Sequence, residues 1–280
     1  KVKKDDGALI STQEVDPPIL ITKSDGSYLY LTTDLGTVLF RENKSSFDKY
    51  IYVVDSRQEN HFKQLFTTVK HFGLSNSDFF HVGFGTINGS DNKPFKTRDG
   101  GVYKLNLLFE DIKEKLKKYN SDDQVLNTLT NTVLTYSDLL PNRNQNYIFD
   151  VDKFTDINGK TGIYIQYAQV RARKLLDSST KPGSYNINYE INSEERNLLL
   201  LITKFDYFFN LSLINMEPHH LAEYLFNLSQ AFNSFYTNNK IFSDKIPIET
   251  QINRIKIVEE FFKTISLVFN CLGIEAAESM

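Results

Sequence analysis

The sequence predicts an α/β fold followed by an all-helical part, and two observations support this. Over residues 19–87, short apolar runs alternate with amphipathic stretches, the order expected of a parallel sheet with crossover helices. After Gly101 the strand pattern stops and helical periodicity takes over. A chain of 280 residues exceeds the size at which one core grows comfortably, so we expect two domains.

The α/β part begins with two predicted strands, at 19–23 and 27–32, on either side of the turn Ser24-Asp25-Gly26. A helix is expected over 35–44, with Asp34 as its N-cap. The remaining elements follow in chain order: a buried strand at 50–55, a helix from 58 to about 71, and a strand at 79–87.

The helical part starts at Leu105. Polar residues around 142–146 and the turn-forming pair Asn158-Gly159 interrupt it, and the segment 178–187 has the composition of a linker. Further helices are predicted at 161–177, 193–214, 218–235 and 250–272, with Pro218 in the first turn of its helix.

Composition excludes several classes of protein. A net charge of -3 and a pI near 6.0 exclude a generally basic nucleic-acid coat, so any RNA binding must use local patches. The one cysteine, Cys271, excludes an intrachain disulfide framework and a cysteine-rich zinc site. The N-terminal residues carry no apolar segment of a signal peptide, and the apolar stretch 198–213 is interrupted by polar residues. We expect a soluble, cytoplasmic protein.

Two familiar kinds of site are excluded by spacing. The string Gly83-Phe-Gly85-Thr-Ile-Asn-Gly89 has one residue too many for a dinucleotide fingerprint, and a polar turn rather than a helix follows it. The sequence contains no phosphate-binding P-loop motif. His219-His220 lacks further ligand types at metal spacing, so no metal site is expected.

Tyr30, Asp34 and Gln58 form the most informative group. In a parallel sheet, the carboxyl ends of neighbouring strands line a common crevice, and both predicted strand ends carry these polar side chains. A carboxylate, a phenol and an amide there could hold a planar cation by charge-assisted hydrogen bonds. The alternatives are a helix N-cap for Asp34, a strand aromatic for Tyr30 and a helix-surface residue for Gln58.

Two further segments carry cations. The loop 91–101 contains Lys93, Lys96 and Arg98, which could clamp a polyphosphate or could form a solvated basic turn. In the helical part, Tyr167 and Arg171 are four residues apart and share one helix face. An aromatic ring beside a guanidinium is suited to stacking unpaired bases, although core packing with solvated charges explains most such stripes.

Taken together, these strings resemble the arginyl-tRNA synthetases, which are class I aminoacyl-tRNA synthetases. The resemblance runs from about residue 6 to the end, in the family's order and spacing. Its segments are Asp25-Gly-Ser-Tyr28-Leu-Tyr30-Leu-Thr-Thr-Asp34, Tyr52-Val-Val-Asp-Ser56-Arg57-Gln58 with His61-Phe62, His81-Val-Gly-Phe84-Gly85, Lys93-Pro-Phe-Lys96-Thr-Arg98, Gly159-Lys-Thr-Gly162-Ile-Tyr164, Phe232-Asn233-Ser-Phe235-Tyr236 and the final Leu272-Gly-Ile-Glu-Ala-Ala-Glu278-Ser-Met280.

The resemblance implies roles for residues of the α/β part. Tyr30, Asp34 and Gln58 match the pocket for the substrate arginine, with Asp34 facing the guanidinium. Arg98 stands in the place of the second lysine of the family's Lys-Met-Ser-Lys-Ser loop, and Lys93 or Lys96 supplies the other charge. Residues that match the segment bordering the adenine and ribose of ATP are His81, Val82, Phe84 and Gly85.

In the helical part, the resemblance implies an anticodon-binding domain. The family's usual arginine before the last methionine is Ser279 here, so one basic contact is absent. Residues that fall where family members contact the anticodon loop are Tyr164, Arg171, Tyr236 and Met280.

The resemblance also implies a domain organisation and a reaction. We expect the second half of a Rossmann-like catalytic domain over 1–104, a helical connector over 105–145 and an anticodon-binding domain over 146–280. The family's first signature, His-x-Gly-His, is not in this sequence, so the chain resembles the C-terminal portion of a synthetase. The implied enzyme is a monomeric arginine–tRNA ligase that uses L-arginine, ATP, Mg²⁺ and arginine tRNA and has no membrane partner.

Two other functions fit the sequence. The chain as given could be a catalytically incomplete tRNA-binding fragment, or it could be an unrelated nucleotide-binding α/β enzyme with a helical appendage. Transfer of arginine to tRNA separates the synthetase from the first alternative, and specificity for arginine separates it from the second.

Overall fold

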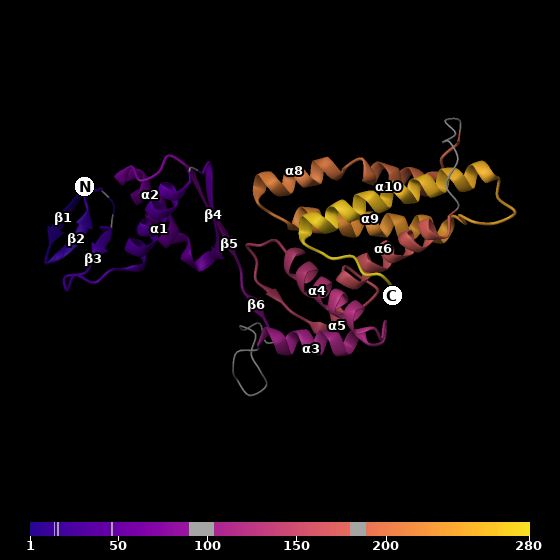
Figure 1. Cartoon of the computed structure of the whole chain (residues 1–280), viewed down its shortest axis with the longest axis horizontal. Helices are drawn as coiled ribbons and strands as arrows, with labels where there is room; N and C mark the ends of the chain where they lie inside the picture. The colour runs from indigo at the N-terminus through magenta and orange to yellow at the C-terminus, as the bar shows by residue number, and fades with distance from the viewer. Residues whose placement is uncertain (14, 16, 46, 90–103, 180–188) are drawn as a thin grey trace. The chain divides into compact units, whose positions relative to one another are not determined.

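The computed structural model describes residues 1–280 apart from 14, 16, 46, 90–103 and 180–188 (Figure 1). The chain divides into two compact units, Lys1–Thr86 and Ile87–Met280. The second unit begins at Ile87 because Ile87 and Asn88 pair with one of its strands. The domain bounds expected from the sequence stay a prediction. The expected α/β part followed by a helical part is confirmed.

The first unit opens with an antiparallel sheet of β1 (Val2–Asp5), β2 (Ala8–Ser11) and β3 (Leu20–Thr22), in that order. The sequence analysis missed the β1–β2 hairpin and wrongly assigned its neighbour β3 to a parallel sheet. Every residue of β1 is exposed, so no apolar alternation marks the strand. The turn Asp6-Gly7, with φ of 44° and 82°, is the Asp-Gly hairpin signal.

A parallel pair of strands forms the rest of this unit. β4 (Lys49–Asp55) pairs with β5 (Asp78–Phe84), and the 3₁₀ turn Ser56–Gln58 and α2 (Glu59–Phe72) connect them. The predicted strand–helix–strand order is confirmed here. On β4, Tyr52 and Val54 pack on the core, while Ile51 and Val53 are exposed, as the two-residue period of a strand requires.

Helix α1 (Tyr30–Lys44) corrects the predicted strand at 27–32 and the predicted helix start at residue 35. Its buried positions, Leu31, Leu35 and Val38, recur every three to four residues and face the core of this unit. The β-branched pair Thr32-Thr33 suggested a strand, but both hydroxyls bond backbone carbonyls nearby, Thr33 to Tyr30 at 2.8 Å.

The second unit is mainly helical. A short parallel pair, β6 (Ile87–Asn88) and β7 (Tyr147–Ile148), joins the start of this unit to the segment that follows its second helix. Its helices are α3 (Leu105–Leu116), α4 (Asp123–Leu139), α5 (Val151–Phe154), α6 (Gly162–Asp177), α7 (Ser193–Ile202), α8 (Phe205–Asn215), α9 (His219–Asn238) and α10 (Ile248–Leu272).

Two hydrophobic clusters hold this unit together. One joins α6, α7, α9 and α10, and Phe232 stacks on Phe261 at its centre with 4.0 Å between ring centroids. The other joins α3, α4 and α6 to the C-terminal residues Ala277 and Met280. Helix α6 contributes to both, and Gly162 lets it approach closely, because a Cβ there would lie 2.9 Å from the Thr132 carbonyl oxygen.

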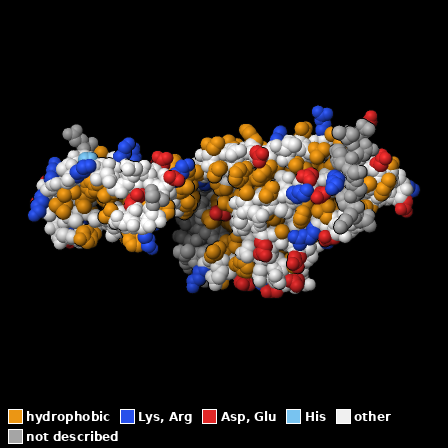
Figure 2. Space-filling model, turned by 45° about the horizontal axis from the view of Figure 1, so that its top comes forward, with side chains coloured by type: hydrophobic (Ala, Val, Ile, Leu, Met, Phe, Trp, Pro, Cys, Tyr) orange, Lys and Arg blue, Asp and Glu red, His pale blue; other side chains and the backbone are white. Residues whose placement is uncertain are grey.

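The predicted helix at 193–214 is divided in the structure into α7 and α8. The span Ser193–Asn215 is long and apolar enough to cross a membrane by length and composition alone. Its buried Glu195, however, accepts a 2.8 Å hydrogen bond from Arg254 of α10, which packs α7 within the helical unit. Tyr207 and Ile214 of α8 are exposed, and Figure 2 shows mostly hydrophobic and uncharged side chains at this end of the unit.

The side chain of Gln166 fixes the C-terminal segment to α6. Its Nε2 donates to Thr132 Oγ1 at 2.8 Å and to the Glu275 carbonyl at 2.6 Å, and its Oε1 accepts from the Ala277 N–H at 2.9 Å. Gln166 is fully buried, so these bonds have no competing water.

We expect Gln166→Leu to destabilise the second unit by about 3 kcal/mol, because it removes three hydrogen bonds and leaves their partners buried. Thermal unfolding should show a fall in Tm of roughly 6–12 °C for a unit of this size. The matched control is Gln169→Leu, on the same helix and equally buried, whose amide has no hydrogen-bond partner in the described part of the chain. Equal falls in Tm for both variants would contradict the role of the Gln166 hydrogen bonds in fixing the C-terminal segment.

Candidate functional site

Tyr30 and Asp34 lie on the first turns of α1. They are four residues apart and therefore share a helix face. Leu29, not Asp34, is the N-cap of the helix, and the predicted capping role of Asp34 is wrong. Tyr30 is 87% exposed and the Asp34 side chain 38% exposed, so both are accessible to a ligand.

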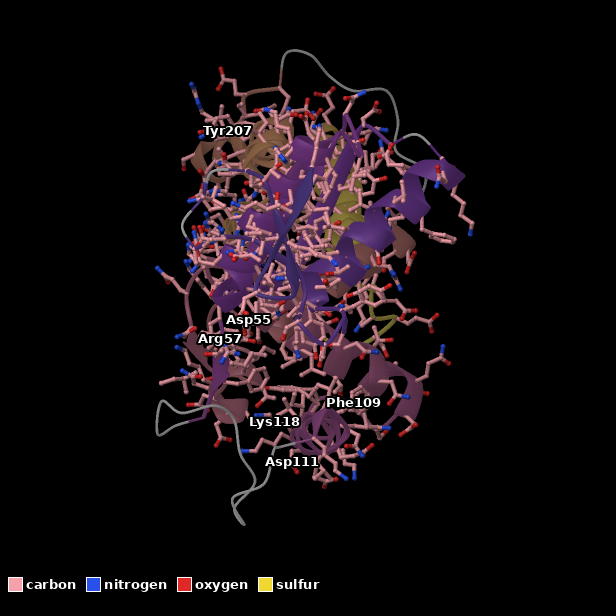
Figure 3. The ribbon with its side chains drawn as sticks, turned by 90° about the vertical axis from the view of Figure 1, so that its left-hand side faces the viewer. Asp55, Arg57, Phe109, Asp111, Lys118 and Tyr207 are labelled. Atoms are coloured by element: carbon pink, nitrogen blue, oxygen red, sulfur yellow. The ribbon has the colours of Figure 1, made fainter. Side chains whose placement is uncertain are left out.

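Gln58 is held by the turn that follows β4. Asp55 caps this turn by accepting from the Arg57 N–H at 2.8 Å, and it pairs with the Arg57 guanidinium through both oxygens (Figure 3). These hydrogen bonds from Arg57 lower the pKa of Asp55 to about 2. Gln58 then becomes the N-cap of α2, with an exposed side chain that makes no cap bond. It is available for a ligand.

His61 brings the two helix starts together. Its Nε2 lies 2.7 Å from Asp34 Oδ2. Burial raises the pKa of the nearby Tyr52 phenol, and the Asp34 charge adds to the rise while Arg41 opposes it. Sequence reasoning gave His61 no role. The signal was its position three residues after Gln58, on the same side of α2.

The predicted ATP segment follows on β5. His81 stacks on Phe62 with 5.6 Å between ring centroids, and Phe62 contacts the His61 ring edge-on at 5.1 Å. His81 Nε2 is buried and has no hydrogen-bond partner among the described residues. Val82 is buried, Phe84 is exposed at the strand end, and Gly85 follows it. Lys93, Lys96 and Arg98 lie outside the described residues.

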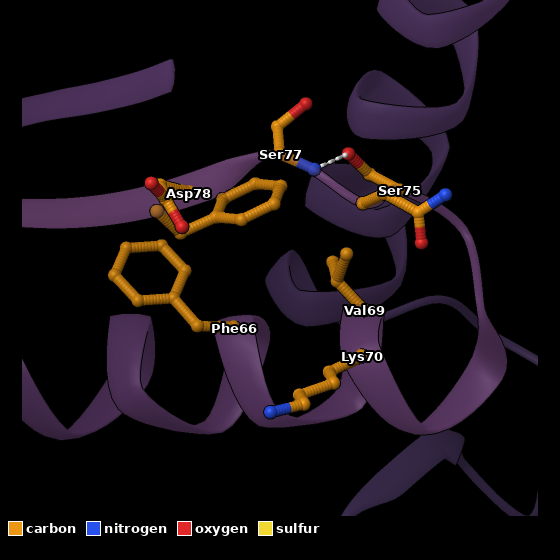
Figure 4. A pocket seen from close by; sticks show the side chains of 8 residues that line it. Phe66, Val69, Lys70, Ser75, Ser77 and Asp78 are labelled. Carbon is orange, nitrogen blue, oxygen red and sulfur yellow. Dashed lines mark hydrogen bonds between the residues drawn. The ribbon is translucent and has the colours of Figure 1, made fainter. Parts of the chain in front are cut away.

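A pocket of about 360 Å³ lies at the amino end of β5, between α2 and Asp78 (Figure 4). Phe66, Val69 and Phe79 form its apolar wall, and Ser75 and Ser77 its polar rim. Because ligands of parallel sheets bind at the carboxyl ends of strands, we do not include this pocket in the candidate site.

In the second unit, Arg171 lies between two tyrosine rings. Its guanidinium carbon is 3.9 Å from the Tyr167 ring centroid and 4.7 Å from that of Tyr236. It donates to Tyr167 Oη at 2.6 Å and to Asn233 Oδ1 at 3.0 Å. The predicted proximity of Tyr167 and Arg171 is confirmed, and α9 adds Tyr236, which is 37% exposed. The result is a fixed, planar, cationic and aromatic surface.

The other two residues predicted to contact an anticodon lie elsewhere in this unit. Tyr164 packs on Phe226, with ring centroids 5.3 Å apart, and Met280 packs on the cluster around α3 and α4. Within the described residues, neither makes a ring contact or hydrogen bond with Arg171 or Tyr236.

The structure places Glu217 beside His219 and His220, with one ligand atom of each within 4.8 Å of the others. The expectation that the histidines lack a further ligand type is therefore wrong. However, His220 Nε2 already contacts the Glu217 carboxylate at 3.1 Å, and the positive end of α9 disfavours a cation. Burial, with His220 adding to it, lowers the pKa of His219. We assign no metal to this cluster.

Comparisons with known proteins identify two families along the chain. Residues 1–151 match the family described as tRNA synthetases class I (R), catalytic domain, and residues 165–280 match the DALR anticodon binding domain. An arginine–tRNA ligase of Alkaliphilus oremlandii is 36% identical over 98% of this chain, and one of Francisella tularensis subsp. tularensis is 34% identical over all of it. The chain spans about half the length of these relatives, 50% in both cases.

Solved structures show the same fold. An arginyl-tRNA synthetase of Plasmodium falciparum superposes with a TM-score of 0.80 and 25% identity, over 100% of this chain and 50% of that one. One from Thermus thermophilus, at 17% identity, superposes with a TM-score of 0.82 over 98% of this chain and 54% of that one.

Proposed function

We propose, from the premise that this chain belongs to the arginyl-tRNA synthetase family, that it supplies the arginine-binding helices and the anticodon-binding domain of an arginine–tRNA ligase. The observation that carries the proposal is the Asp34 carboxylate, held by His61 on one oxygen and accessible beside Tyr30. A half-exposed carboxylate next to a phenol can bind a guanidinium by charge-assisted hydrogen bonds. Gln58, at the start of α2, adds an amide for the same substrate.

The proposed reaction has two steps. The arginine carboxylate attacks the α-phosphorus of ATP, which gives arginyl-adenylate and releases pyrophosphate. The 2′-hydroxyl of the terminal tRNA adenosine then attacks the arginyl carbonyl and releases AMP. In this chain, Asp34, Tyr30 and Gln58 hold arginine, while His81 lies on the strand that borders the nucleotide. Stacking on Phe62 fixes the His81 ring in that position.

We assign charge stabilisation on the phosphates to Lys96 and Arg98, with Val82, Phe84 and Gly85 along the adenine and ribose. ATP enters as its Mg²⁺ complex, so the ion belongs to the substrate. The described carboxylates at this site are already paired, Asp34 with His61 and Asp55 with Arg57, and we assign neither to the ion.

Arginine charging of tRNA tests the proposal directly. A synthetase of the relatives' full length that contains this sequence should attach arginine, and no other amino acid, to arginine tRNA. We further propose that it acts as a monomer in the cytoplasm, without a membrane partner. Charging with a different amino acid would contradict the proposal, and RNA binding without any charging would favour a tRNA-binding module.

The proposed anticodon contact predicts a defect for Tyr236→Ala. Stacking of a base on an aromatic ring contributes about 1–3 kcal/mol, so tRNA affinity of the 280-residue chain should fall by roughly 5- to 150-fold. The matched control is Tyr207→Ala, which removes another exposed tyrosine from the same unit and should leave affinity unchanged (Figure 3). Filter binding to arginine tRNA at fixed salt measures both, with Tm recorded in parallel.

If Tyr236→Ala binds tRNA like the unaltered chain, the Arg171 surface is not the contact. A fall in Tm that accounts for the lost affinity would instead assign Tyr236 to the core, together with its neighbour Phe232, whose ring centroid lies 6.2 Å away.

A further inference from the structure

We infer that His61 is a positioning residue that holds the Asp34 carboxylate in the orientation that receives the arginine guanidinium. This inference rests on the proposed function. It follows from the 2.7 Å contact between His61 Nε2 and Asp34 Oδ2, which joins the first turns of α1 and α2.

The contact leaves the rest of the carboxylate available. Asp34 Oδ2 accepts from His61, while Oδ1 has no hydrogen-bond partner in the described part of the chain. A guanidinium is planar and prefers a carboxylate that is fixed in one plane, because two parallel hydrogen bonds form only in that orientation. A carboxylate on a helix surface otherwise samples several rotamers, and binding would have to restrict them.

His61 is itself fixed by aromatic packing. Its ring meets Phe62 edge-on, with centroids 5.1 Å apart and an interplanar angle of 86°. Phe62 is buried in the core of the first unit and also contacts Tyr52, with centroids 4.8 Å apart. The same Phe62 ring stacks on His81 of β5. The position of Asp34 is therefore tied through His61 to the core, and through Phe62 to the strand proposed to border ATP.

A purely stabilising ion pair is the competing explanation. The side chains of His61 and Asp34 are 30% and 38% exposed, so solvent screens their attraction and the pair contributes little to folding. Loss of His61 should consequently leave Tm nearly unchanged. Its effect should appear in the binding of arginine.

The test uses a full-length synthetase that contains this sequence, assayed by arginine-dependent exchange of pyrophosphate into ATP. His61→Ala should raise the KM for arginine by about tenfold and leave kcat and the KM for ATP unchanged, because the lost bond orients a group that contacts arginine alone. His61→Gln, whose Nε2 can donate from nearly the same place, should restore most of the affinity. The matched control is His71→Ala, at the other end of α2, which should behave like the unaltered enzyme.

A double-mutant cycle tests whether His61 acts on arginine binding through Asp34. If His61 acts through Asp34, His61→Ala should add nothing to the defect of Asp34→Ala, which removes the carboxylate that His61 contacts. An active enzyme in which His61→Ala keeps the arginine KM of the unaltered protein would overturn this inference and leave the proposed function intact. Additive defects of the two substitutions would also overturn this inference, as would a fall in Tm without a change in the KM for arginine. An unaltered enzyme without arginine-dependent exchange would overturn both proposals.

Discussion

The 280-residue chain assayed alone is expected to show no arginine-dependent exchange between ATP and pyrophosphate. The sequence contains no His-x-Gly-His string, the first signature of the family it belongs to. Removing even one preorganised donor to a developing charge costs about 100-fold or more, and the loss of a whole donor set should bring the rate to background.

The parallel pair of the first unit gives a second reason. Ile51 and Val53 of β4 are exposed on the face opposite to α1 and α2, so toward the carboxyl end of β4 this face presents apolar side chains. The cation on the same face, Lys49, stands at the amino end of the strand. The assay compares the 280-residue chain with a full-length synthetase that contains it, at equal concentration. Binding of arginine tRNA by the shorter chain shows that it is folded. Exchange at a rate near that of the longer protein would contradict the expectation.

Asp34→Asn in the full-length synthetase should weaken arginine binding by roughly 10- to 150-fold, because it removes a charge-assisted hydrogen bond contributing about 1.5–3 kcal/mol. Asparagine keeps the volume and can still accept from His61, so the architecture of the two helix starts should persist. The KM for ATP should stay nearly unchanged, because the change affects the group that faces the guanidinium.

Asp78→Asn is the matched control for this variant. It removes the same charge from the opposite end of the strand pair, where Asp78 begins β5. Steady-state exchange with varied arginine and varied ATP separates the two constants, and Tm reports on folding. Since Leu29 is the N-cap of α1, a stability loss without an arginine defect cannot be assigned to capping and would leave Asp34 as a partner of His61 only.

The fold was predictable wherever periodicity was strong. The strand–helix–strand order from β4 to β5 follows from an apolar run and the amphipathic stretch after it. Three helices begin after a residue whose side chain caps them: Asp122, Thr161 and Asn192. The start of α1 could not be predicted from the sequence, because Thr32 and Thr33 favour strands in isolation. The helix is favoured there by the burial of Leu31, which the sequence alone does not show.

The site was only partly predictable. The sequence placed Tyr30, Asp34 and Gln58 in one crevice but put the first two at a strand end, whereas they stand on a helix. The pairing of Asp34 with His61 joins residues 27 positions apart, and no local pattern encodes it. Tyr167 beside Arg171 follows from helical spacing, but the approach of Tyr236 depends on how α9 packs on α6.

The fixed C-terminal segment has a consequence for the order of events during synthesis. Ala277 is part of the cluster that buries Leu108 of α3 and Val125 of α4, and Gln166 holds it there. A ribosome adding about 5–20 residues per second needs roughly 7–28 s to proceed from the end of α4 to Ala277. During that interval α3 and α4 cannot complete their core, so their apolar faces stay open to chaperones. The second unit therefore finishes folding only after its last residues leave the exit tunnel.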